Sequence, residues 1–206
     1  MAARTAAELA LPVRIDLAVP SLTPDSLSPY PIIYWRMTAQ QSIPPARAFS
    51  AINSYLQRGG MVIFDAPDQA GAVGSGAGGG IRQKLEAIMN GLDIPPLTEL
   101  NEEHVLNRSF YLTHGLPGRY INGSVLVERN TASNDGVSSV IVGGNDWAGA
   151  WAKDASGMPL YAAVPGGEQQ REMAFRAGVN MVVYALTGNY KADQVHVPAI
   201  MQRLNQ

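Results

Sequence analysis

Residues 32–65 read IIYWRMTAQQSIPPARAFSAINSYLQRGGMVIFD, and this stretch predicts the fold. It begins and ends with short apolar runs, 32–35 and 61–64, whose β-branched and aromatic side chains are typical of buried strands. Between them the Pro44-Pro45 pair favours a helix start, and apolar residues recur at helical spacing from 49 to 56. We therefore predict a parallel strand–helix–strand crossover, which places the chain in the α/β class.

The flanking sequence extends this pattern in both directions. Before the crossover we expect a helix within 1–11 and a connection over 20–31 that is rich in Pro and Ser. After it we expect a glycine-rich loop over 66–80, a short helix over 81–89, strands at 110–112, 124–127 and 137–142, an edge strand or hairpin arm at 158–164, and the longest helix over 168–186. A last helical turn or two is expected near 200–204.

Composition limits the classes of function. The chain has 206 residues, which fits a single domain over 1–206. Its 15 basic and 17 acidic residues give a net charge of −2, so no global basic field attracts nucleic acid. With no cysteine, the chain contains no disulfide, thiolate metal site or cysteine nucleophile. No apolar run reaches the roughly 18 residues that a membrane span requires.

Polar residues follow two of the predicted strands at their carboxyl ends, where ligands collect in open parallel sheets. Asp65 and Asp68 follow one strand, and Asn145, Asp146 and Trp147 follow another. Carboxylates on neighbouring strand ends can bind Mg²⁺ or act as an acid–base pair. The alternative is structural: Asp65 caps a turn and Asp146 starts a helix.

Other motifs indicate no catalytic or metal-binding residue. The loop contains Gly74-x-Gly76-x-x-Gly79, but this glycine pattern does not follow directly on a strand, as a dinucleotide site requires. The three histidines are scattered, without a pair at metal-ligand spacing, and no G-x-S-x-G serine elbow is present. We therefore predict no cofactor and no bound metal.

Two cations complete the candidate ligand-binding residues. Arg171 shares one side of the long helix with Glu168, Glu172 and Arg176, a spacing typical of solvated ion pairs. Alternatively, Arg171 or Arg176 faces a ligand or partner. Lys191 lies in the polar segment 189–194, which we expect to form a rim over the sheet.

Several strings together resemble a known family. They are HVL at 104–106 with SFYL at 109–112, GGNDW at 143–147, QRE at 170–172 running into GVN at 178–180, and YALTGNYK at 184–191. They resemble a family of domains of unknown function found at the C-terminus of large bacterial membrane proteins of the Bat aerotolerance-regulator type. The resemblance covers nearly the whole chain, and the last string is the most specific part of it.

The resemblance implies a class I glutamine amidotransferase-like fold, which is a flavodoxin-like three-layer sandwich with a mostly parallel sheet. Family domains begin with a strand and turn before the first helix. We expect this chain to start inside that helix, so its N-terminus is truncated and its first strand is missing or supplied otherwise. In amidotransferase-like enzymes a cysteine occupies the turn after a central strand. The matching position here is Ala66, so the resemblance implies a scaffold without the hydrolytic nucleophile.

The sequence leads to one functional hypothesis and two rivals. We expect a non-catalytic ligand- or protein-binding domain of an envelope-associated bacterial protein, tethered to the inner membrane through flanking segments, with the periplasmic side favoured. Its partners would be other envelope or membrane-protein domains, or a small molecule, and not nucleic acid. One rival is a metal-assisted hydrolase or carbohydrate-active enzyme that uses Asp65 and Asp146. The other is a purely structural interaction module.

Overall fold

Over the residues that the structure describes, the fold centres on one mixed sheet of five strands in the order β1-β2-β5-β4-β3. A computed structural model describes residues 22–67, 78–121, 123–129 and 137–187. In this part of the chain β1 (Ile32–Arg36), β2 (Met61–Asp65) and β5 (Val140–Gly143) are parallel. The antiparallel strands β4 (Val125–Glu128) and β3 (Leu97–Glu99) complete the sheet beside β5. The chain therefore has the predicted α/β class, with a sheet that is mixed.

The predicted crossover at 32–65 is confirmed. Helix α3 (Ala46–Gln57) connects β1 to β2, with Pro45 as its N-cap residue. The exit from α3 needs glycine twice. Gly59 has φ of +87°, and a Cβ on Gly60 would lie 2.3 Å from the Tyr55 ring. That ring packs against the turn because its hydroxyl donates to the Met61 carbonyl at 3.1 Å and accepts from the Met61 N–H at 3.2 Å.

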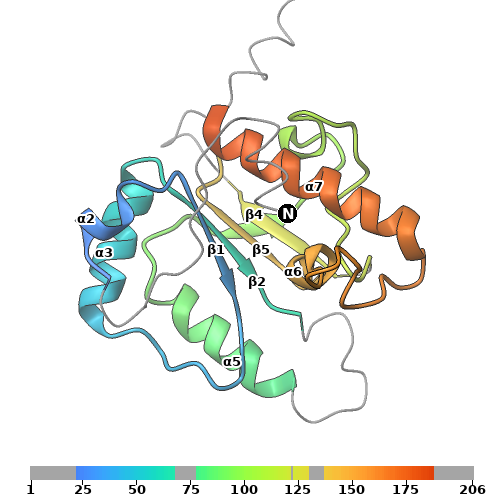
Figure 1. Ribbon diagram of the computed structural model, residues 1–206. Coiled ribbons are helices and arrows are strands. Elements are labelled where there is room, and N and C mark those ends of the chain that lie inside the picture. Colours follow the sequence, from blue (N-terminus) through green and yellow to red (C-terminus); the bar gives the residue numbers. More distant parts are fainter. Residues whose placement is uncertain (1–21, 68–77, 122, 130–136, 188–206) are drawn as a thin grey trace, which may run out of the picture.

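Helices cover both faces of the sheet (Figure 1). Phe64 on β2 packs in one core with α3, α2 (Pro24–Leu27) and α5 (Gly78–Met89). Ile63, whose side chain points the other way, packs in a second core with α7 (Gly167–Thr187) and the 3₁₀ turn η2 (Val105–Asn107). Because successive side chains of a strand alternate between faces, an apolar run such as MVIF is what a strand buried on both sides requires.

Several predicted elements differ from the structure. Residues 110–112 form no strand, because the N–H groups of Phe110 and Tyr111 both donate to Asn180 Oδ1, at 3.0 and 2.7 Å. The segment 158–164 contributes only an isolated bridge between Pro159 and Lys153. The connection over 20–31 contains α2, whose N-cap Thr23 forms a capping box with Ser26. Strand β3 is not in the prediction, and α5 begins at Gly78 instead of 81.

The helix expected within 1–11, most of the glycine-rich loop and the tail near 200 lie outside the described residues. Over the described ranges, no helix has both the length and the apolarity needed to cross a lipid bilayer.

Candidate functional site

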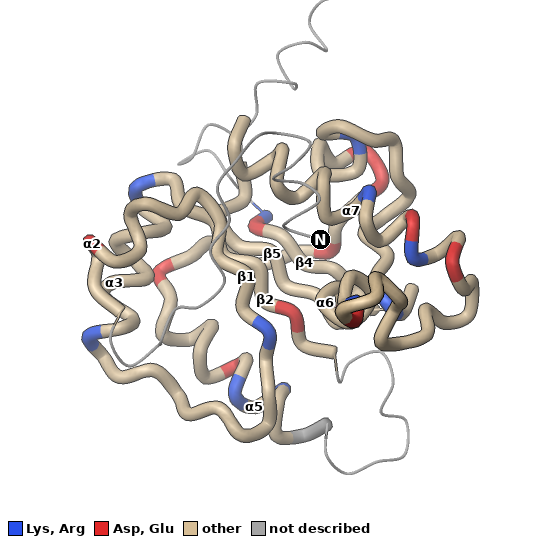
Figure 2. The backbone as a smooth tube through the Cα atoms, viewed as in Figure 1, with Lys and Arg blue, Asp and Glu red and all other residues tan. Residues whose placement is uncertain are grey.

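The carboxyl ends of β1, β2 and β5 lie together at one edge of the sheet. Arg36 pairs with Asp65 in register, and Asp65 pairs with Gly143. After β2 the chain passes to α5 on one face, whereas after β5 it passes to α6 (Trp147–Trp151) and α7 on the other. Adjacent parallel strands whose connections leave on opposite faces form a topological switch point, the place where open α/β sheets bind ligands. In Figure 2 a basic segment at the end of β1 lies beside an acidic one at the end of β2.

Asp65 lies at this switch point and is fully buried. Its Oδ2 accepts a hydrogen bond from the Tyr34 hydroxyl, which in turn accepts from the Ala148 N–H at 3.0 Å. Asp65 Oδ1 is also buried and has no hydrogen-bond partner among the described residues. Burial raises the pKa of Asp65 to about 6, against the opposing effect of the Tyr34 hydrogen bond, and the charge of Asp146 raises it further. The tyrosine responds in the same direction: burial and the neighbouring Asp65 raise the pKa of Tyr34 well above its ordinary value.

Asp146 is the second acidic residue of the switch point, and its backbone is left-handed with φ of +51°. It is the N-cap of α6, where its Oδ1 accepts from the Gly149 N–H at 3.2 Å. Two arginines hold the same carboxylate: Arg36 Nη2 lies 3.1 Å from Oδ1, and Arg119 Nη1 lies 3.3 Å from Oδ2. The carboxylate is nearly inaccessible, with 3% of the side chain exposed, so both ion pairs are shielded from water on that side.

Arg119 is held by more than its ion pair. Its Nε donates to the Ala162 carbonyl at 3.2 Å, and its guanidinium lies 5.1 Å from the ring centres of both Tyr120 and Tyr161. Its main-chain N–H also donates to the Asp146 carbonyl at 3.3 Å. The guanidinium plane is therefore fixed by two aromatic rings and two oxygens.

The structure brings Asp65 and Asp146 together, as the sequence predicts, but it turns three other candidates inward. Asn145 donates to the Leu116 carbonyl and accepts from the Gly123 N–H, both at 2.9 Å. Trp147 also donates to the Leu116 carbonyl at 2.9 Å, and it is completely buried. These contacts fasten Leu116 and Gly123 to the carboxyl end of β5.

Arg171 is the third of these inward-facing candidates, with 5% of its side chain exposed. It donates to the carbonyls of Ala150 at 2.6 Å and Tyr161 at 2.5 Å, in addition to its ion pair with Glu168. Its donors therefore connect α7 to α6 and the following loop. Asp68 and Lys191 lie outside the described residues.

Sequence reasoning missed Tyr34, Arg36 and Arg119. A signal existed for the first two, because Tyr34 and Arg36 are two residues apart on a strand and must share a face. Ile63 of β2 points toward the same face, and so does Asp65, which lies two residues further along that strand. For Arg119 no signal exists, since it lies in an irregular loop without apolar periodicity.

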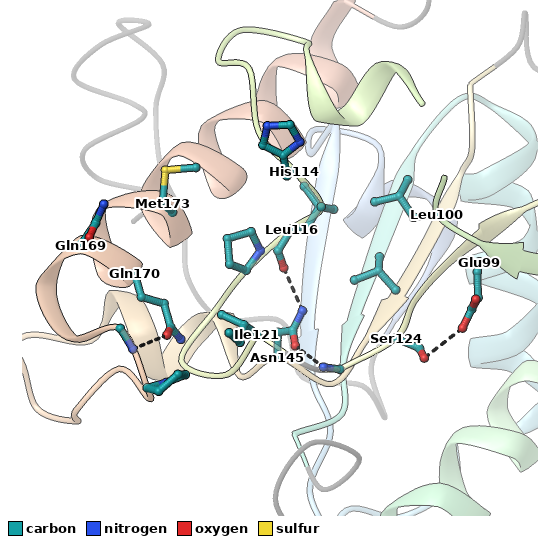
Figure 3. Close-up of a pocket in the computed structure, with 16 residues that line it drawn as sticks. Glu99, Leu100, His114, Leu116, Ile121, Ser124, Asn145, Gln169, Gln170 and Met173 are labelled. Carbon is teal, nitrogen blue, oxygen red and sulfur yellow. Dashed lines mark hydrogen bonds between the residues drawn. The ribbon is translucent and has the colours of Figure 1, made fainter. Parts of the chain in front are cut away.

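A pocket of about 690 Å³ opens next to the switch point. It lies between the last residue of β3, the first residue of β4 and the start of α7. Figure 3 shows Gln169, Gln170 and Met173 of α7 on one side of it and Glu99 and Leu100 on the other. Its walls are mainly apolar and include Leu100, Leu116, Pro117, Ile121, Val125 and Met173.

Polar groups surround this pocket. Glu99 accepts a hydrogen bond from Ser124 at 3.1 Å, and His114 and Gln169 are exposed at its opening. Asn145 lies at its base (Figure 3). The segment 116–121 is a wall between the two features, since Leu116 and Ile121 line the pocket whereas Arg119 binds Asp146.

The carboxylates at this edge do not gather as metal ligands usually do. Among the residues that the structure describes, no group of three His, Asp or Glu side chains could hold a metal ion. Asp65 is engaged by a tyrosine and Asp146 by two arginines.

The fold and this edge define an α/β domain with an open mixed sheet and helices on both faces. Residues 1–186 match the model of a family described as a domain of unknown function (DUF4159), and the chain belongs to that family. The predicted membership of a domain-of-unknown-function family is thus confirmed. None of the curated proteins compared with the chain matches it.

Proposed function

We propose that this chain is a non-catalytic binding domain that takes a small ligand, or a side chain of a partner protein, in the pocket between β3, β4 and α7. The observation that carries the proposal is the pocket itself. Its volume of about 690 Å³ falls within the roughly 300–1,000 Å³ of small-molecule sites, and it combines apolar walls with a few polar groups.

The polar groups suggest the chemistry of the ligand. Glu99 offers a carboxylate acceptor, Gln169 offers an amide and His114 an imidazole, while the walls offer apolar contact. A ligand with an apolar body and an amine or hydroxyl donor would satisfy both parts. Burial of apolar surface contributes about 25 cal/mol per Å². The apolar walls would therefore supply most of the affinity, and the polar groups would orient the ligand.

The residue that follows β2 supports a non-catalytic role for the domain. Ala66 follows Asp65 there, and its main-chain N–H donates to the Gly143 carbonyl at 2.7 Å. In the amidotransferase-like scaffold that the sequence resembles, this turn carries the nucleophile, and alanine has none. Helices on both faces of the sheet support the proposal that the single domain has the flavodoxin-like layering of that scaffold.

The wider context rests on the family resemblance alone. We propose that the domain belongs to a larger envelope-associated bacterial protein of the Bat aerotolerance-regulator type. In that setting it is tethered to the inner membrane, faces the periplasm and contacts other envelope or membrane-protein domains.

Methyl NMR of methionine tests the pocket directly, because Met173 lines it. We expect members of a library of small amine- and hydroxyl-bearing fragments to shift the Met173 methyl signal, assigned with Met173→Leu. Ser124→Trp should abolish the shift, since Ser124 is exposed at the pocket lining. The matched control is Ser50→Trp, an exposed serine of α3 on the other face of the sheet. The proposal is rejected if no fragment shifts Met173, or if Ser124→Trp leaves the shift unchanged.

A further inference from the structure

The switch point contains a pair of arginines that the pocket does not use. Arg36, at the end of β1, and Arg119, in the loop before β4, both lie within 3.3 Å of the Asp146 carboxylate. They come from segments about 80 residues apart, yet one buried carboxylate holds their guanidinium groups next to each other. We propose that Arg36 and Arg119 form a second binding site, which takes the carboxylate group of an organic acid.

Unused hydrogen-bond donors are the first support. A guanidinium has five N–H donors in a planar fork that matches a carboxylate. The Arg36 side chain donates to Asp146 through Nη2, and its Nε and Nη1 have no partner in the described part of the chain. The side chain is 48% exposed, which leaves these donors accessible. Arg119 uses Nε and Nη1, and its Nη2 has no partner within the same ranges.

Rigidity is the second support. The Arg119 guanidinium lies against Tyr120 and Tyr161 at 5.1 Å, and Asp146 fixes the end of Arg36. Ordering a long basic side chain costs up to about 2 kcal/mol. Where the folded protein already holds the donors in place, a ligand does not have to supply that free energy. Asp146 itself adopts a left-handed backbone that non-glycine residues seldom adopt, and such conformations cluster at functional sites.

Charge selects the class of ligand. While Asp65 is protonated, the two guanidinium groups exceed the one negative charge of Asp146 by a single unit, and one carboxylate ligand neutralises that excess. A dianionic phosphate would reverse the sign of the cluster. A planar carboxylate can accept two parallel N–H bonds from one guanidinium, which is the strongest geometry for this pair.

The probe for this site is sodium acetate, with sodium chloride and inorganic phosphate at matched ionic strength. The readout is the Nε–Hε NMR signals of Arg36 and Arg119, assigned with Arg36→Lys and Arg119→Lys. We expect saturable shifts of both signals with acetate and none with chloride. Arg36→Gln should weaken acetate binding about tenfold or more, since it removes the more accessible guanidinium. Asp146 would keep Arg119 and the Gly149 N–H in this variant, so the fold should persist.

Arg58→Gln is the matched control, because Arg58 is exposed at the end of α3. It should leave acetate binding unchanged. Shifts that grow linearly without saturation, an equal response to chloride, or full binding by Arg36→Gln would overturn the site. Phosphate binding more tightly than acetate would overturn the choice of a carboxylate. The pocket is followed through Met173 instead, so either proposal can fail without the other.

Discussion

The Tyr34 hydroxyl donates to Asp65 Oδ2 across two adjacent parallel strands, while the N–H of Ala148 donates to that hydroxyl at 3.0 Å. This relay connects β1, β2 and the start of α6, and the Asp65 side chain in it is completely buried. One oxygen of the carboxyl is satisfied and the other has no partner among the described residues. The charged form of Asp65 is therefore disfavoured, although the residue stands at the edge of the sheet where ligands collect.

Asp65→Asn should change how stability depends on pH. The pKa of Asp65 rises from 3.8 to about 6 on folding, so the folded chain holds this proton more tightly than the unfolded chain. The contribution to the free energy of unfolding is complete below pH 3.8 and is lost as pH rises through about 6. One pKa unit corresponds to about 1.4 kcal/mol, so the loss amounts to roughly 3 kcal/mol. The free energy of unfolding of Asp65→Asn, relative to that of the native chain, should therefore increase by about this amount between pH 4 and pH 7.

Urea unfolding at a series of pH values measures this gain. Asp93→Asn, which removes one exposed carboxylate after α5, is the control for the loss of a charge. If the free energies of unfolding of Asp65→Asn and the native chain differ by the same amount from pH 4 to pH 7, the pKa of Asp65 is not raised on folding.

Two substitutions at Asp146 separate the contribution of the helix cap and the left-handed backbone to stability from the contribution of the charge. Asp146→Asn keeps a side-chain oxygen for the Gly149 N–H, and asparagine tolerates the left-handed backbone. Asp146→Ala loses the cap as well and places alanine at φ of +51°. Both lose the ion pairs with Arg36 and Arg119. We therefore expect Asp146→Ala to be less stable than Asp146→Asn by about 2 kcal/mol in urea unfolding. Equal stabilities would mean that neither the cap nor the backbone conformation contributes.

Asn145→Ala should loosen the wall between the pocket and the arginine pair. The Asn145 side chain is buried and makes two hydrogen bonds of 2.9 Å, to the Leu116 carbonyl and from the Gly123 N–H. Its removal leaves the Gly123 N–H without this partner, whereas the Leu116 carbonyl keeps its hydrogen bond from Trp147, so we expect a loss of about 1–3 kcal/mol in the free energy of unfolding. Hydrogen exchange at Gly123 should accelerate, whereas exchange at Ile63 in the centre of the sheet should follow only the global loss of stability. Unchanged protection of Gly123 would contradict the assigned role.

How far the sequence predicts this structure depends on where each residue's partners come from. Strands β1, β2 and β5 are visible because each is a continuous apolar run, and the crossover between β1 and β2 follows from local order. Strand β3 has only three residues, with two of them partly buried, so it has no pattern to detect. Its place in the sheet is set by pairing with β4, a contact about 30 residues away.

The same distinction applies to the candidate site. Strand ends place Asp65 and Asp146 at one edge, and the sequence shows those ends. It does not show that Asn145 and Trp147 turn inward, because the partner of both is the carbonyl of Leu116 in an irregular loop. Arg171 looks like a surface residue from its i, i+3 spacing to Glu168. Only the path of the 150–161 segment shows that two carbonyls bury it.

Gly143 and Gly80 should respond in opposite directions to the same substitution. A Cβ on Gly143 would lie 2.3 Å from Trp147 Cη2, and that ring is fully buried and fixed by its bond to Leu116. Gly143→Ala must displace the ring or the end of β5, and overpacking of this kind costs about 1–3 kcal/mol. Gly80 lies in α5, where the nearest atom to an added methyl group would be the Ala39 Cβ at 3.9 Å. Gly80→Ala should therefore stabilise the chain by about 0.5–1 kcal/mol through helix propensity.

The urea concentrations at the midpoints of unfolding of the two variants give the comparison directly. If Gly143→Ala were as stable as the native chain while Gly80→Ala gained stability, the close contact of Trp147 with β5 would be wrong, and with it the anchoring of α6 at the switch point.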